Sequence, residues 1–272
     1  MNRDIPSRSG YALVTGGKAR LGAAIVRKLA GEGWKIAIHV HHPDAAATTL
    51  AADIKRAGGE ALVVVGDLAD AEFCSTVFTQ LGPLGFCSVL VNNASLFEYD
   101  DISNISAKSM DAHYHANLRA PVLLSRAFAE QLPPEAKGLI VNIIDQKVFN
   151  LNPDFLSYTV SKAALESATQ LLAMALAPKV RVVGVAPGLS LRSGAQTEEG
   201  FQKAHAHTPL GFGSTPEDIA ETVSYIVRVP SLTGKTIVVD GGQSLVRRDH
   251  DVMFSYGISP DAPVGPKGSA KG

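Results

Sequence analysis

The sequence predicts a single α/β domain: a doubly wound parallel sheet of about seven strands with helices on both faces. Short β-branched apolar runs recur along the chain without polar alternation, which is typical of parallel strands buried on both faces. Longer amphipathic stretches separate the runs, which indicates successive strand–helix–strand units. The runs lie at 11–16, 34–40, 60–68, 88–94, 138–145, 180–188 and 235–242.

The composition excludes several classes of protein. The chain has 272 residues, of which 46% are hydrophobic, so it can bury a core and global disorder is excluded. A formal net charge of -1 argues against broad binding to nucleic acid or anionic membranes. Cys74 and Cys87 provide no disulfide framework and no zinc-ligand spacing. The start, MNRDIPSRSG, lacks the apolar region of a signal peptide, and no apolar run reaches membrane-spanning length, so we expect a cytoplasmic protein.

The same pattern predicts one domain over 11–250, because nothing resembling a linker interrupts it. Residues 1–10 are expected to form an N-terminal tail. Residues 251–272 are expected to be a C-terminal extension and mostly a mobile tail, since their end is rich in Pro, Gly and Lys.

A glycine-containing turn follows the first predicted strand and leads directly into a helix. Its sequence is TGGKARLG, residues 15–22. Gly16 and Gly22 fit the first and last positions of a turn whose backbone N–H groups approach a pyrophosphate. An ordinary strand–helix turn is the alternative, but the place after the first strand favours a dinucleotide bound in a Rossmann fold. Arg20 stands where the middle glycine usually stands, and it is expected to bind a phosphate or to reach the substrate as a fixed cation.

The end of the second strand bears on which dinucleotide is bound. NAD-binding proteins usually carry an acidic residue there, which bonds the ribose 2′-OH and would repel a 2′-phosphate. Here the segment carries His39, His41 and His42, with Lys18 in the nearby loop, which favours NADPH. Solvated histidines and Asp44 as a ribose partner are alternatives, and a metal site is disfavoured because no further ligand is close in sequence.

Polar and small residues also follow the third and fourth strands. Asp67 and Leu68 follow one strand, and Asn93, Ala94 and Ser95 follow the next. Ligands of doubly wound sheets lie at these carboxyl edges, so the residues are expected to contact the cofactor. Ordinary Asx turns are the alternative.

With these motifs in place, the sequence resembles the short-chain dehydrogenase/reductase family over about residues 11–247. The resemblance rests on TGGKARLG, GDL, NNAS, Asn117, Tyr158-x-x-x-Lys162, the PG at 187–188 and VDGG at 239–242. It implies a homotetramer and NADPH as the cofactor. The residues that it implies around the cofactor are Gly16, Lys18, Arg20, Leu21, Gly22, His39, His41, His42, Asp67, Leu68, Asn93, Ala94, Ser95, Tyr158, Lys162, Pro187, Gly188 and Ser190.

Two departures from the general family pattern narrow the resemblance. Arg20 replaces the middle glycine, and Asp145 occupies the position of the usual catalytic serine. Both are features of pteridine reductases and of the related dihydromonapterin and dihydrofolate reductases. His42-Pro43 stands where those enzymes often carry an Arg-Ser pair, which bears on the choice of cofactor. The resemblance places around a pterin the residues Arg20, Ser95, Phe97, Asp145, Tyr158 and Ser190.

Tyr158 and Lys162 are i,i+4 neighbours and share one helix face if the segment is helical. A tyrosine with its ordinary pKa of about 10 is a slow proton donor and acceptor at neutral pH. We expect the lysine ammonium and the oxidised nicotinamide to lower the pKa of Tyr158. The resemblance implies that Lys162 also bonds the nicotinamide ribose and that Asn117 organises a proton-relay water. A surface pair on an amphipathic helix is the alternative.

Asp145 suits a pterin better than a ketone. An ionised carboxylate would repel the alkoxide that forms when a ketone is reduced. A pterin C=N bond instead takes a hydride on carbon and needs a proton on nitrogen, which a carboxyl beside Tyr158 can pass on. Phe97 would stack on the flat ring. The alternatives are a strand-end cap for Asp145 and core packing for Phe97.

The sequence therefore predicts an NADPH-dependent reductase of a pterin, dihydropterin or dihydrofolate C=N bond. One alternative is a carbonyl or 3-oxoacyl reductase of the same family. Another is a catalytically silent dinucleotide-binding regulator, although a regulator has no need of Tyr158, Lys162 and Asn117. The segment from Leu189 to Pro209 is expected to form a lid over the substrate.

Overall fold

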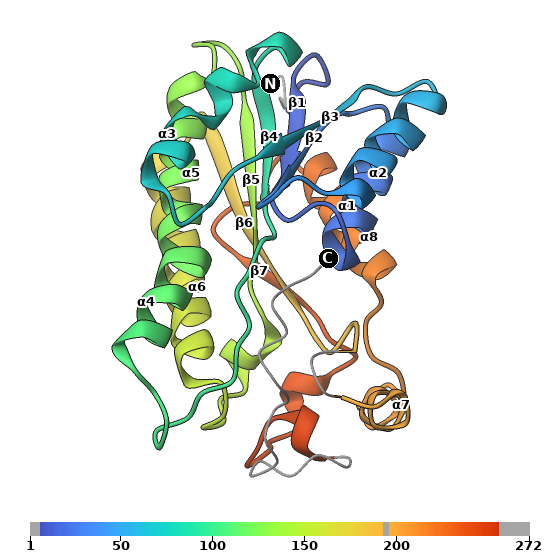
Figure 1. Cartoon of the computed structure of the whole chain (residues 1–272), viewed down its shortest axis with the longest axis vertical. Coiled ribbons are helices and arrows are strands. Elements are labelled where there is room, and N and C mark those ends of the chain that lie inside the picture. The colour runs from blue at the N-terminus through green and yellow to red at the C-terminus, as the bar shows by residue number, and fades with distance from the viewer. Residues whose placement is uncertain (1–5, 193–195, 256–272) are drawn as a thin grey trace.

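The computed structural model describes residues 6–192 and 196–255, and it contains a seven-stranded sheet with parallel pairing throughout (Figure 1). The strand order is β3-β2-β1-β4-β5-β6-β7. The predicted doubly wound fold is confirmed, and each predicted apolar run overlaps one strand, although β4 begins one residue before its run. The strands are β1 Tyr11–Val14, β2 Lys35–Val40, β3 Ala61–Val65, β4 Cys87–Asn92, β5 Gly138–Ile143, β6 Val180–Pro187 and β7 Thr236–Val239.

Helices cover both faces of the sheet (Figure 1). On one face lie α1 (Arg20–Gly31), α2 (Ala45–Arg56) and α8 (Pro216–Arg228). On the other lie α3 (Ala71–Gln80), α5 (Ala120–Gln131) and α6 (Leu156–Leu176). Successive strand residues face opposite layers: Ala12 and Val14 of β1 pack with the first set of helices, and Tyr11 and Leu13 with the second. Both faces are therefore apolar, which explains why the strands lack polar alternation.

The sheet has its switch point at β1, which pairs with β2 on one side and with β4 on the other. The chain runs outward through β2 and β3 and then returns to the far side of β1. Loops leaving β1 and β4 therefore diverge at the carboxyl edge, the place where ligands bind in open α/β sheets.

The remaining helices are short and lie outside these two layers or join them. A π-helical turn, His115–Arg119, lies between α4 (Ala107–Tyr114) and α5, and α7 spans Glu198–Ala206. Short 3₁₀ turns cover Gly82–Leu84 (η1), Gln146–Phe149 (η3), Gln243–Leu245 (η4) and Val252–Ser255 (η5). In Figure 1, α7 and the orange-red turns near the C-terminal end lie below the sheet.

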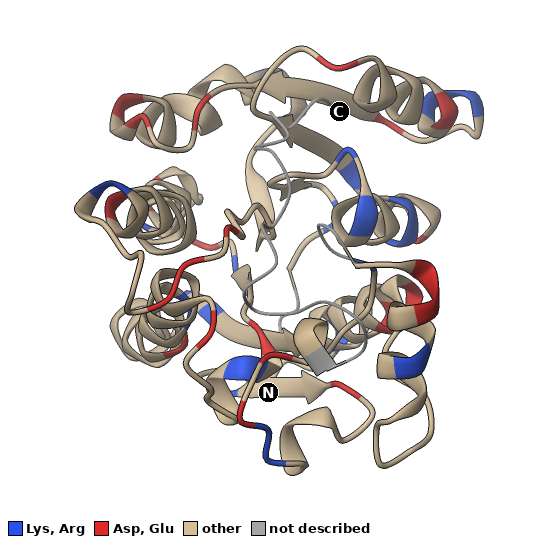
Figure 2. Ribbon diagram, turned by 60° about the horizontal axis from the view of Figure 1, so that its bottom comes forward, with Lys and Arg blue, Asp and Glu red and all other residues tan. Residues whose placement is uncertain are grey.

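Charged residues of both signs are interspersed over the outer helices and loops, while the central strands carry few (Figure 2). Cys74 and Cys87 are unpaired and buried. Within 6–192 and 196–255, no helix has both the length and the apolar character needed to cross a membrane.

The ordered domain extends beyond the predicted boundary at residue 250. Val252, Met253 and Phe254 are buried, so this segment belongs to the packed structure and not to a tail. The rest of the predicted extension, 256–272, lies outside the described residues. At the other end, the Ser7 carbonyl oxygen accepts a hydrogen bond of 2.8 Å from the Ser88 hydroxyl, which ties this part of the predicted tail to β4. Residues 1–5 of the predicted tail lie outside the described residues.

Candidate active site

A large cavity of about 1580 Å³ opens at the carboxyl edge of the sheet. It brings together residues from the segments that follow each of the seven strands, at the edge where ligands of such sheets bind. Every predicted site residue except Asn117 lines it. Those residues are Gly16, Lys18, Arg20, Leu21, Gly22, His39, His41, His42, Asp67, Leu68, Asn93, Ala94, Ser95, Phe97, Asp145, Tyr158, Lys162, Pro187, Gly188 and Ser190.

The turn after β1 has the backbone geometry of an anion site. Gly16 has a φ of +62°, and a Cβ on Gly22 would lie 2.3 Å from the Gly16 carbonyl oxygen, so neither position tolerates a side chain. Helix α1 begins at Arg20 without a side-chain cap and without an acidic residue in its first turn. Its first N–H groups and the positive end of its dipole are thus open to an anion. Arg20 has a φ of 54°, the left-handed conformation that favours glycine.

Two predicted cofactor residues brace this turn from behind. Asn93 donates from Nδ2 to the carbonyl oxygens of Thr15, at 2.9 Å, and Gly16, at 3.2 Å. His39 accepts from the Gly16 N–H through Nδ1 at 3.3 Å, and its Nε2 lies 3.0 Å from the Gly66 carbonyl oxygen. Burial lowers the pKa of His39 to about 4, so the ring is neutral. Both ring nitrogens are therefore occupied within the protein, which assigns His39 to holding the turn.

The residues after β2 form a separate polar group on the cavity wall, together with Lys18 from the turn after β1 and Asp67 from the loop after β3. Lys18 Nζ lies 2.8 Å from Asp44 Oδ2, and Asp44 Oδ1 accepts from the N–H groups of the first turn of α2. The rings of His41 and His42 stack at 3.9 Å, and His41 Nε2 lies 3.6 Å from Asp67. In the part of the chain that the structure describes, no group of three or more His, Cys, Asp or Glu side chains could hold a metal. Asp44 is thus committed to a helix cap and a lysine, which disfavours it as a ribose partner.

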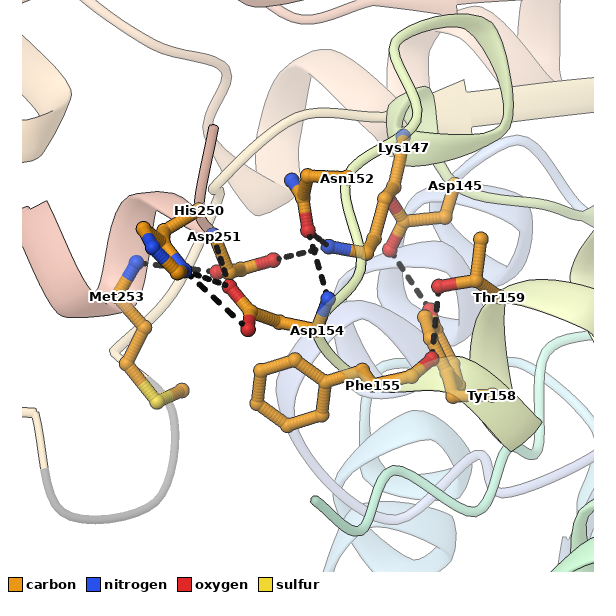
Figure 3. A network of polar contacts seen from close by, with 10 residues as sticks. All are labelled: Asp145, Lys147, Asn152, Asp154, Phe155, Tyr158, Thr159, His250, Asp251 and Met253. Atoms are coloured by element: carbon orange, nitrogen blue, oxygen red, sulfur yellow. Dashed lines mark hydrogen bonds and ion pairs between the residues drawn. The ribbon is translucent and has the colours of Figure 1, made fainter. Parts of the chain in front are cut away.

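The predicted catalytic residues Asp145, Tyr158 and Lys162 lie between the end of β5 and the first turns of α6. The Tyr158 hydroxyl donates to Asp145 Oδ2 at 2.7 Å (Figure 3). Lys162, one helical turn further on, donates from Nζ to the Ile143 carbonyl oxygen at 2.8 Å. Asp145 Oδ1 accepts from the Lys147 N–H at 2.8 Å and caps η3. Asp145 is therefore both a strand-end cap and the partner of Tyr158.

Burial dominates the electrostatics of this centre. It raises the pKa of Asp145, against the lowering effects of the two hydrogen bonds and of Lys162. Burial, and then the Asp145 charge and hydrogen bond, raise the pKa of Tyr158. Burial lowers the pKa of Lys162 to about 8. In the chain on its own the pKa of Tyr158 is therefore raised and not lowered, because the carboxyl and the loss of solvent both disfavour tyrosinate. The pair thus retains a proton at neutral pH. The expected lowering involves the oxidised nicotinamide as well as Lys162, and it stays a prediction for the complex with cofactor.

Asn117 lies behind the cavity wall, in the π-helical turn. Its Nδ2 donates to the Leu96 carbonyl oxygen at 2.9 Å and to the Ser161 hydroxyl at 3.0 Å. Its Oδ1 accepts from the Leu96 N–H at 2.8 Å and from Ser95 Oγ at 3.1 Å. The amide thus fixes the segment after β4 against α6. Single π-turns are often found at functional sites, and here the turn places the Asn117 side chain between the segment after β4 and helix α6.

Aromatic rings form the wall next to Tyr158. Phe97 stacks on Phe155 at 4.3 Å and meets the Tyr158 ring edge-on at 4.7 Å. Phe97 remains 39% exposed, so it is a cavity residue rather than a core residue. Phe155 adopts a φ of 54° just before α6, which turns its ring toward Phe97.

The end of β6 closes the far side of the cavity. Ser190 Oγ donates to the Gly188 carbonyl oxygen at 3.0 Å and shares a 2.6 Å hydrogen bond with the Ser214 hydroxyl. The predicted lid, 189–209, includes α7, but residues 193–195 lie outside the described residues.

Sequence reasoning missed Phe155, Ser161, Lys147 and the segment 251–254. Phe155 and Ser161 each lie three residues from Tyr158, so their spacing could have indicated a shared helix face. Lys147 and Asp251 are 104 residues apart, and no local pattern indicates that their side chains meet.

The cavity of this Rossmann fold is lined by a turn that is open to a pyrophosphate and by a buried tyrosine–lysine pair. These two features define an oxidoreductase that uses a dinucleotide cofactor. The model of the short chain dehydrogenase family matches residues 10–202. The chain belongs to this family.

Three relatives show which branch the chain is similar to. Pteridine reductase 1 of Leishmania tarentolae is 31% identical over 280 residues, covering 87% of this chain and 96% of the relative. FolM alternative dihydrofolate reductase 1 from Brucella suis, solved in complex with NADP, is 40% identical with a TM-score of 0.86, covering 89% and 97%. The Brucella canis protein of the same name, also complexed with NADP, is 39% identical with a TM-score of 0.86, covering 91% and 98%.

Proposed function

We propose that this oxidoreductase uses NADPH to reduce a C=N bond of a pterin, a dihydropterin or dihydrofolate. The observation that carries the proposal is the 2.7 Å hydrogen bond from the Tyr158 hydroxyl to the Asp145 carboxyl. A carboxyl at this position opposes alkoxide formation but suits a ring nitrogen that must gain a proton. The similarity to pteridine and dihydrofolate reductases supports the same substrate class.

In this mechanism the bound nicotinamide supplies the hydride that reduces the ring carbon. Tyr158, whose pKa is raised by burial and by Asp145, holds the proton that the neighbouring ring nitrogen takes up. Burial raises the pKa of Asp145 as well, so its carboxyl is able to take up a proton from water and pass it to Tyr158 after the tyrosine has given its own proton away. Lys162 supplies positive charge 5.8 Å from the Tyr158 ring centroid and offsets the tyrosinate that forms.

The cavity fits the proposed cofactor. The uncapped start of α1 and the glycine turn would hold the pyrophosphate. Lys18, His41 and His42 would meet a 2′-phosphate, since Asp44 is already occupied by Lys18 and by the start of α2. Lys162 would bond the nicotinamide ribose. The Brucella relatives solved with NADP support this choice.

The aromatic wall fits the proposed substrate. A flat pterin ring would stack on Phe97, which Phe155 supports from behind at 4.3 Å. Arg20 and Ser95 would provide polar contacts to the pyrimidinone edge.

The tetramer that the family resemblance implies stays a prediction, which sedimentation equilibrium would test.

The test is a screen of NADPH oxidation with dihydrobiopterin, dihydrofolate, a fully oxidised pterin and a panel of ketones, including a 3-oxoacyl thioester. We expect turnover with the pterins or dihydrofolate and little with the ketones. Turnover confined to ketones would contradict the proposed substrate class while leaving the family assignment intact.

A further inference from the structure

The segment 250–255, which we call the C-terminal strap, folds back over the substrate end of the cavity. Asp251, Val252 and Met253 line the cavity together with Asp145 and Tyr158. The strap is far from these two residues in sequence and belongs to neither the glycine turn nor the tyrosine–lysine motif. Its side chains are therefore placed where they can influence Asp145 and Tyr158.

Polar contacts pin the strap to the loop before α6 (Figure 3). Asp154 Oδ2 accepts from the Asp251 N–H at 2.6 Å and lies 3.3 Å from His250 Nδ1. Asp251 Oδ1 accepts from the Met253 N–H at 3.0 Å. Asp251 Oδ2 lies 2.9 Å from Lys147 Nζ, which also bonds Asn152.

The Lys147–Asp251 ion pair is buried, with side-chain exposures of 3% and 14%. The lysine also lies 5.8 Å from the Phe155 ring centroid, and Phe254 of the strap stacks on the same ring at 6.0 Å. A buried pair is held in one geometry, and solvent screens its charges less than those of a surface pair.

Charged or titratable groups from four elements face the Asp145–Tyr158 pair. Lys162 comes from α6, and Lys147 extends from η3 toward Asp251 of the strap. His113 of α4 lies with its ring 6.4 Å from that of Tyr158. The negative charge of Asp251 raises the pKa of both Asp145 and Tyr158. Around Asp251 itself lie Lys147, Asp154 and His250.

We propose that Asp251 is a positioning residue for proton donation, and that the strap holds its carboxylate where it keeps the proton on the Asp145–Tyr158 pair. Lys147 sets how much of that charge the pair feels, because its ammonium offsets the carboxylate. The inference rests on the proposed role of Tyr158 as proton donor. It assigns the C-terminal strap to the proton-donating machinery as well as to the cavity wall.

The experiment measures the pH dependence of kcat/KM for wild type, Asp251→Asn, Lys147→Met and the double variant. Activity requires a protonated Asp145–Tyr158 pair and a charged Lys162, so it falls as pH rises through the apparent pKa of this coupled group. Asp251→Asn removes a negative charge and should move this alkaline limb to lower pH by about 0.5 unit or more. Lys147→Met removes the positive charge that offsets the Asp251 carboxylate, so it should move the alkaline limb to higher pH. The double variant should return close to wild type.

Asp249→Asn is the matched control, because it removes the same charge from an exposed residue beside the strap. Its pH profile should match wild type. The affinity for NADPH and the thermal unfolding of each variant show whether the fold is intact. Opposite shifts in the two single variants support the proposal, since simple loosening of the strap would move both limbs in the same direction. An unshifted limb in folded Asp251→Asn, or equal shifts in both single variants, overturns it.

The profile is recorded with whichever substrate the wild type reduces. A failed pterin screen then contradicts the proposed substrate, whereas an unshifted limb contradicts only the role of Asp251.

Discussion

Tyr158 and Asp145 share a 2.7 Å hydrogen bond, although they are thirteen positions apart in the chain and a 3₁₀ turn lies between them. The bond joins the end of β5 to the first turn of α6, both buried at the carboxyl edge of the sheet. Because burial raises the pKa of each group, the pair holds a proton under conditions in which an exposed aspartate would have lost it. A retained proton is what the proposed role of Tyr158 as proton donor requires.

Replacing Tyr158 by Phe should reduce kcat by roughly 10²–10⁴-fold, because it removes the proton donor. The affinity for NADPH should stay close to wild type, since the hydroxyl is remote from the glycine turn. Steady-state kinetics and a fluorescence titration with NADPH measure the two quantities. Tyr114→Phe, which removes a hydroxyl from a tyrosine that is 48% exposed, is the matched control. Retained turnover in Tyr158→Phe would identify another group as the donor.

Asp145 should decide the substrate class. Asp145→Asn keeps the cap on η3 but cannot hold or pass a proton, so we expect kcat/KM for a dihydropterin to fall by about 10²-fold or more. Asp145→Ser should show the same loss and gain weak ketone reduction, because an uncharged donor then faces the carbonyl oxygen. The screen of pterins and ketones measures both. Wild-type pterin reduction by both variants would mean that Asp145 is only a cap.

Lys162 should give the enzyme a characteristic pH dependence of stability. Burial lowers its pKa from 10.5 to about 8, so above pH 8 the unfolded state binds more protons than the folded state. The contribution of Lys162 to the free energy of unfolding therefore rises with pH, by up to about 2 kcal/mol between pH 8 and 9.5. Lys162→Met lacks this rise, so wild type should gain stability relative to the variant over that range.

Urea unfolding at several pH values measures the effect. Lys55→Met, at an exposed lysine of α2, should track wild type throughout. A constant difference between wild type and Lys162→Met from pH 7 to 9.5 would show that the lysine has an ordinary pKa.

The enzyme should prefer NADPH to NADH. The double variant His41→Ala/His42→Ala should lose about tenfold in kcat/KM for NADPH, because donors to the 2′-phosphate are removed. Its kcat/KM for NADH should be nearly unchanged, which makes NADH the internal control. Equal or better use of NADH by the wild type would indicate that Asp44 meets the ribose despite its bond to Lys18.

Local signals in the sequence determined the parallel sheet, the glycine turn and the tyrosine–lysine spacing. Buried parallel strands need continuous apolar runs, a pyrophosphate turn needs residues without side chains at Gly16 and Gly22, and a shared helix face needs i,i+4 spacing. Each requirement acts over a few consecutive residues, so each leaves a pattern that can be recognised in the sequence. Asp145 was also recognisable, because it is the carboxylate that ends a predicted apolar strand.

Only the tertiary structure decided how these groups act on one another. The rise in the pKa of Tyr158 comes from burial and from Asp145, and both depend on how β5 and α6 pack. His39 faces inward because its ring bonds two loops that lie apart in sequence. The strap reaches the cavity because Asp251 meets Lys147 across 104 positions of the chain. Desolvation and long-range ion pairs depend on distances in space, and the order of residues along the chain does not specify those distances until the sheet has formed.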